Sequence, residues 1–130
     1  MSTKLIMSAS AIVMGVMGIL ATFMPQEILN YFGVSASDTL SIIIQIIGAL
    51  YVAFGLLNWM SKDNKIGGIY GKPLAKGNFA HFFIAGMALI KGAMSGIFSS
   101  PILLILTGVY VLFAILFILI AFTDLIKTKE

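Results

Sequence analysis

The chain has 130 residues, of which 60% are hydrophobic and 10% are charged, and its mean hydropathy is +1.09. Because soluble domains carry about 25% charged residues, this composition excludes a water-soluble domain as the main structure and predicts an integral membrane protein. The absence of cysteine excludes disulfides and cysteine nucleophiles, and a net charge of +3 that comes only from lysine predicts membrane lipids, not nucleic acid, as the partner.

Four apolar stretches of about twenty residues each are long enough to cross a bilayer as helices. They predict helices at about 5–24, 39–60, 78–98 and 101–124. Lipid offers no partners for open backbone groups, so helices are favoured over strands. A cleaved signal peptide is the alternative for residues 5–24, but this apolar run is longer than the usual 7 to 15 residues or so.

The connections between these stretches carry their own signals. Pro25 ends the first helix, because proline disfavours helical geometry in the residue before it. Residues 26–32 predict a short amphipathic turn at the membrane interface, with Ile28, Leu29 and Phe32 facing lipid. Residues 61–77 predict a basic cytoplasmic loop, and Pro101 is expected in the first turn of the fourth helix.

Lysines flank one side of the predicted bundle and are absent from the other side. The loop at residues 25–38 contains Glu27 and Asp38 but no lysine. By the positive-inside rule, both termini are expected in the cytoplasm of a bacterial cell, with the chain in the inner membrane. The predicted fold class is all-α: one integral membrane domain, residues 1–130, folded as an antiparallel four-helix bundle. The lysines on the cytoplasmic side are Lys4, Lys62, Lys65, Lys72, Lys76, Lys127 and Lys129.

Small residues follow one face of each predicted helix. Helices in lipid associate through close packing and interhelical hydrogen bonds, so these small-residue faces are expected to lie inside the bundle. In chain order the faces are Ser8, Ala11, Gly15, Gly18 and Thr22; Ser41, Gly48 and Gly55; Asn78, His81, Ala85, Ala88, Gly92 and Ser95; and Thr107, Ala114 and Ala121.

The run QIIGALYVAFGLLNW from Gln45 to Trp59, together with Met24–Pro25 and the Phe32–Gly33 pair, resembles small bacterial DoxX-like membrane proteins. The resemblance implies a four-helix membrane fold. Members often carry arginine and glutamate within their helices. This chain has no arginine, and no glutamate in its predicted spans, so no redox or quinone-linked site residue is carried over.

Gln45, Lys91 and Thr107 form a first candidate site. Each is predicted to lie roughly 9 to 10 Å below the outer end of its helix. One interpretation is an outward-facing polar pocket in which the Lys91 ammonium binds an anionic or carbonyl group. The other is that Lys91 extends its charge to the membrane surface while Gln45 and Thr107 bond across helices. The modest depth favours the second interpretation.

A second candidate cluster lies near the inner surface and contains Asn58, Asn78, His81 and Asp124. His81 and Asp124 could form a proton-relay pair. All four residues lie within about a turn of the cytoplasmic interface, where polar side chains cost little free energy. A structural role is therefore favoured for this cluster.

No nucleophile with an adjacent base is present, and neither a cofactor nor a metal site is predicted. The favoured function is a non-enzymatic accessory or scaffold component of the membrane, acting with a membrane protein partner or as a homo-oligomer. The first alternative is a small transporter or binding protein for an anionic or hydrophobic solute that uses Lys91, Gln45 and Thr107. The second is a membrane enzyme acting on lipid or quinone through His81 and Asp124.

Overall fold

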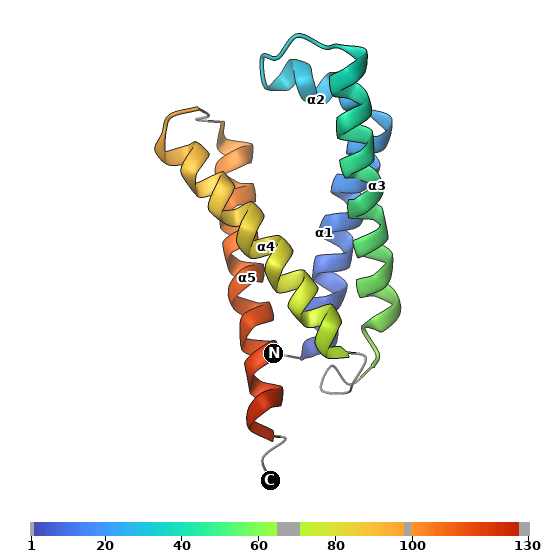
Figure 1. Cartoon of the computed structure of the whole chain (residues 1–130), viewed down its shortest axis with the longest axis vertical. Helices are drawn as coiled ribbons and strands as arrows, with labels where there is room; N and C mark the ends of the chain where they lie inside the picture. The colour runs from blue at the N-terminus through green and yellow to red at the C-terminus, as the bar shows by residue number, and fades with distance from the viewer. Residues whose placement is uncertain (1, 65–70, 98–99, 128–130) are drawn as a thin grey trace. The chain divides into compact units, whose positions relative to one another are not determined.

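A computed structural model describes the backbone of residues 2–64, 71–97 and 100–127, and the side chains of these residues up to 122. This part of the chain contains five helices and no strand, which confirms the all-α class (Figure 1). The chain divides into two compact units, Met1–Asp63 and Asn64–Glu130, and the single membrane domain stays a prediction. The helices are α1 (Thr3–Phe23), α2 (Pro25–Tyr31), α3 (Asp38–Ser61), α4 (Gly71–Met94) and α5 (Pro101–Lys127).

Three of the described helices are long and apolar enough to cross a membrane. They are α1, α3 and the Pro101–Phe122 part of α5, with mean hydropathies of 2.1, 2.3 and 3.0. Within the described residues α4 is not among them, since polar and charged side chains reduce its hydropathy. The third predicted span, 78–98, is therefore helical in the part that the structure describes but more polar in composition than the other three.

The first connection begins as expected and then differs in its packing. Met24 leaves helical geometry with φ −129° and ψ 46°, and Pro25 opens α2. Leu29 was predicted to face lipid, but its side chain is only 6% exposed. The reason is that α2 folds back onto α1 and α3, so its apolar face is covered by protein.

The boundaries of α4 differ most from the prediction. The helix begins at Gly71, inside the segment predicted as a loop at 61–77, because Pro73 lies in its first turn, where a missing N–H is tolerated. It ends at Met94 and not at residue 98. Gly96 takes φ +71°, and the Ile97 N–H donates to the Gly92 carbonyl at 3.2 Å, a Schellman motif that closes the helix.

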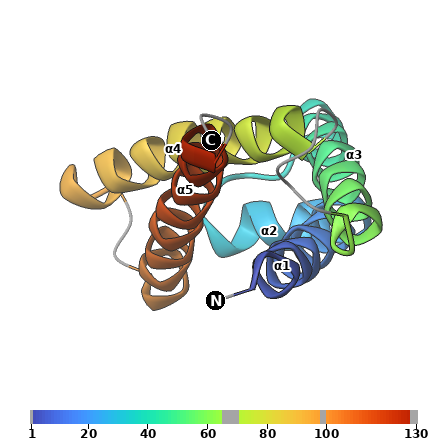
Figure 2. The same ribbon diagram turned by 90° about the horizontal axis from the view of Figure 1, so that it is seen from below.

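In the first unit α1 and α3 pack closely side by side (Figures 1 and 2). A Cβ atom added at Gly18 would lie 2.7 Å from the Val52 backbone nitrogen, and one at Gly48 would lie 2.9 Å from the Gly18 oxygen. The two helices can approach this closely because Gly18 and Gly48 have no side chains. The small-residue faces predicted for these two helices are thereby confirmed at Gly18 and Gly48.

Aromatic rings fill much of the interface between α4 and α5 in the second unit. The Phe82 side chain is fully buried and stacks on Phe113 and Phe117 of α5, with ring centroids 4.9 and 5.8 Å apart. Ala88, which the prediction placed inside, is exposed. The small-residue face predicted for α4 is thus wrong at this position, because large rings fill the α4–α5 interface. The two helices are inclined to each other in both views (Figure 2).

Candidate functional site

A buried polar pair lies between α1 and α3. The Asn58 Nδ2 donates to Ser10 Oγ at 3.0 Å, and Ser10 Oγ donates to the Met7 carbonyl at 2.9 Å. Both Ser10 and Asn58 are 0% exposed. A buried side-chain amide is costly unless it is hydrogen-bonded, so this pair fixes the register of the two helices. The sequence placed Asn58 in the inner cluster but did not identify Ser10. Ser10 lies three residues after Met7 and four before Met14, and this spacing marks the buried face of α1.

Gln45, predicted as a ligand-binding residue, makes an interhelical contact in the first unit. Its Nε2 donates to the Thr22 carbonyl at 3.2 Å, close to the end of α1. The Thr22 hydroxyl in turn donates to the Gly18 carbonyl at 2.8 Å. Gln45 therefore joins α3 to the last turn of α1, next to the close approach of Gly18 and Gly48.

Two polar residues of the second unit, Thr107 and Asn78, donate hydrogen bonds to their own helices. The Thr107 hydroxyl donates to the Leu103 carbonyl at 2.7 Å, and the Asn78 Nδ2 donates to the Leu74 carbonyl at 3.0 Å. Both acceptors lie four residues earlier in the same helix. Such bonds satisfy side-chain donors within a helix that faces an apolar environment.

Lys91 lies in the last turn of α4, and its side chain is exposed. Lys91 lies three positions before the final residue of the helix, Met94, which corresponds to about 4.5 Å along the axis. Gln45 is seven residues from the start of α3, or about 10 Å. The depth predicted for Lys91 was too large, because it assumed a helix continuing to residue 98. A cation in a last turn is also stabilised by the helix dipole.

The inner cluster is divided between the two units. Asn58 belongs to the first unit, whereas His81 and Asn78 are three residues apart on α4. The His81 ring is half-buried and lies 5.7 Å from the Tyr110 ring, centroid to centroid. Asp124 belongs to α5, and its side chain is outside the described part of the chain. The relay pair of His81 and Asp124 stays a prediction, as does the pocket of Lys91, Gln45 and Thr107.

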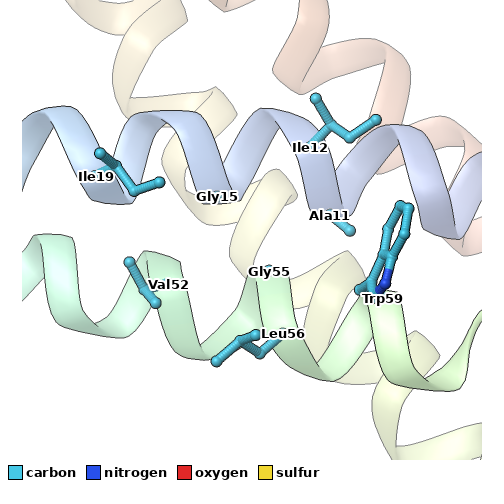
Figure 3. A pocket seen from close by; sticks show the side chains of 8 residues that line it. All are labelled: Ala11, Ile12, Gly15, Ile19, Val52, Gly55, Leu56 and Trp59. Carbon is cyan, nitrogen blue, oxygen red and sulfur yellow. The ribbon is translucent and has the colours of Figure 1, made fainter.

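The first unit also contains an apolar groove that the sequence analysis did not predict. It lies between α1 and α3, has a volume of about 230 Å³, and ends at Trp59, which extends from α3 toward α1 (Figure 3). Gly15 forms part of its floor, and a Cβ added there would meet no atom within 4 Å. The other lining residues are Ala11, Ile12, Ile19, Val52, Gly55 and Leu56.

Charged side chains gather at the Trp59 end of this groove. The Lys62 ammonium lies 3.1 Å from the centroid of the Trp59 ring, a cation–π contact. Lys4 and Asp63 form an ion pair at 2.6 Å. The hydrogen bond from Lys4, with the charges of Lys4 and Lys62, holds the pKa of Asp63 below its usual value of 3.8. Among the described residues, Lys4, Lys62 and Asp63 give this end of the unit a net charge of +1.

Apolar side chains cover most of the outer surface of the spanning helices. On α3, for example, Ile42, Ile46 and Leu50 are 55%, 59% and 58% exposed. Continuous apolar surface of this kind requires lipid around it. With three helices suited to crossing a bilayer, the chain is an integral membrane protein of the helical class. No protein-family model, curated protein or solved structure matches the chain, so the resemblance to DoxX-like proteins stays a prediction.

Proposed function

We propose that this chain is a four-span protein of the bacterial inner membrane that acts as a non-enzymatic accessory or scaffold component. The observation that carries the proposal is how its membrane-depth polar groups are used. Asn58, Gln45 and Thr107 donate hydrogen bonds to a neighbouring helix or to their own helix. The bonds of Asn58 and Gln45 join α3 to α1, and the bond of Thr107 satisfies its hydroxyl within α5, so all three groups have a structural use that supports the proposal.

The proposed topology has α4 as the fourth span. Its 24 residues correspond to about 36 Å, enough to cross a hydrocarbon core of about 30 Å. Lys72 and Lys76 lie near its start and Lys91 lies in its last turn, so its most apolar part is central. Four crossings and the lysine distribution support a topology with both termini in the cytoplasm.

The exposed apolar faces of α3 and α5 support an accessory role, because they can pack against helices of another membrane protein or of a second copy. The small residues Gly18 and Gly48 lie between α1 and α3, so the outer face of α3 stays exposed. A scaffold needs stable helices with accessible surfaces, and both units meet this requirement.

Cysteine crosslinking in native membranes tests this role, since the chain has no cysteine of its own. Single cysteines are placed in turn along the exposed face of α3, at Ile42, Ile43, Ile46, Ile47 and Leu50. The proposal predicts crosslinks to one partner, or to a second copy, at positions that recur with the helical period. Gly48 lies on the same helix but is buried, so it is left out of the series. Ala53 is exposed and lies about two turns beyond Ile46, so Ala53→Cys extends the series.

Two results would contradict the scaffold role. One is crosslinking without any periodicity at these positions, which indicates random collision in the bilayer. The other is turnover or saturable solute binding by the purified protein that disappears in a Lys91→Ala variant. The second result would favour the transporter or binding-protein alternative.

A further inference from the structure

We propose that the groove between α1 and α3 binds one acyl chain of an anionic phospholipid, with the lipid phosphate held by Lys62. This inference rests on the membrane location of the first unit and is independent of the scaffold role. Nothing in the polar clusters discussed above is required for it. The shape of the groove, its lining and the charge at its end support it.

The groove is elongated. Its lining on α1 runs from Ala11 to Ile19, which is about 12 Å along the helix. Its volume is about 230 Å³. An elongated apolar groove of this length suits one extended acyl chain.

The lining is apolar and open to the bilayer. Ile12, Ile19 and Leu56 are 58%, 54% and 58% exposed, and they form the rims of the groove. The floor at Gly15 has free space above it. Because the groove is open along its rims, an acyl chain can enter sideways from the surrounding lipid without any movement of α1 or α3.

Charge complementarity at one end of the groove selects the headgroup. Trp59 closes that end, and Lys62 lies over its ring just beyond the last turn of α3. Among the described residues, Asp63 is already paired with Lys4, and Lys62 has no carboxylate within ion-pair distance. Lys62 is thus available to a phosphate at the depth where lipid headgroups begin. One lysine near the surface corresponds to about a fivefold preference for an anionic lipid over a zwitterionic one.

Trp59 is the single tryptophan of the chain, so its fluorescence reports directly on this groove. The full-length protein is reconstituted in mixed bilayers in which either phosphatidylglycerol or phosphatidylcholine carries bromine atoms on its acyl chains. Bromine quenches tryptophan only at short range. We expect that about five times more brominated phosphatidylcholine than brominated phosphatidylglycerol is needed to quench Trp59 to the same extent.

Three variants separate the groove and the charge from general contact with lipid. Lys62→Gln removes the proposed phosphate contact and should abolish the preference. Gly15→Leu places a side chain in the free space of the groove and should reduce it at least by half. Gly108→Leu is the control. Gly108 is an exposed residue of α5 with free space around its Cβ position, so this variant should leave the preference unchanged. Circular dichroism of each variant shows that it is folded.

The proposal would be overturned by equal quenching from the two brominated lipids in the unmodified protein. It would equally be overturned if the preference persisted in folded Lys62→Gln or folded Gly15→Leu. Quenching that falls as the protein-to-lipid ratio rises would indicate that a second copy covers the groove instead. If Gly15→Leu does not fold, Lys62→Gln alone decides between the two outcomes.

Discussion

The contact between Asn58 and Ser10 is the residue-scale feature on which the packing of the first unit most depends, because both side chains are completely buried. Interhelical hydrogen bonds in membranes contribute about 0.6 kcal/mol on average and about 1.7 kcal/mol at most. A double-mutant cycle of Ser10→Ala and Asn58→Leu should give a coupling free energy in this range, measured by unfolding in mixed micelles. Ser8→Ala, on the same helix and half-buried, is the control. A coupling indistinguishable from zero would show that the pair does not hold the helices.

A second residue-scale prediction concerns Asp63, whose pKa is held below 3.8 chiefly by the hydrogen bond from Lys4. A depressed carboxyl pKa stabilises the folded state above the unfolded-state value, and this contribution is lost as pH falls through the folded-state value. NMR titration of the Asp63 carboxyl should give a midpoint below 3.8, and Lys4→Gln should raise it. Because both side chains are exposed, the effect on overall stability should be small. A midpoint unchanged by Lys4→Gln would contradict the pairing.

At the scale of the helices, the close approach of α1 and α3 gives the clearest prediction. A Cβ at position 48 would lie 2.9 Å from both the Gly18 oxygen and the Thr22 nitrogen, which are backbone atoms and cannot rotate away. Gly48→Ala should therefore reduce the free energy of unfolding by about 1 to 3 kcal/mol, as overpacking does in tightly packed interiors. The measurement is reversible unfolding of the protein in detergent micelles.

Gly15→Ala is the matched control for this experiment, since its Cβ would meet no atom within 4 Å. It should be neutral or stabilise the protein by up to about 1 kcal/mol through helix propensity. Equal destabilisation by Gly15→Ala and Gly48→Ala would mean that α1 and α3 are not packed as described.

The helices differ in how far the sequence predicted them. Pro25 predicted where α1 ends and Pro101 predicted where α5 begins, because proline restricts the backbone strongly and locally. The end of α4 was missed although Gly96 marked it, since a glycine in an apolar run also suits a packing face. The burial of Phe82 was missed because aromatic and aliphatic residues look alike to a hydropathy pattern.

The candidate sites were the least predictable feature. Residue type and spacing identified Gln45 and Asn58 as unusual within membrane helices, but not their acceptors. Those acceptors are the Thr22 carbonyl, 23 positions away, and the Ser10 hydroxyl, 48 positions away. Partners at such separations depend on how two helices pack, which no local pattern encodes. The apolar groove likewise depends on Gly15 and Gly55 facing each other across an interface.

At the scale of the whole molecule, the proposed topology depends on α4 crossing the bilayer as a fourth span. Since the chain has no cysteine, Asn64→Cys and Ile97→Cys can be labelled singly on either side of α4 with a membrane-impermeant maleimide. Four spans with a cytoplasmic N-terminus predict that Ile97→Cys reacts in intact cells and that Asn64→Cys reacts only after the membrane is permeabilised. Labelling of both positions from the same side would show that α4 does not cross and would contradict the account.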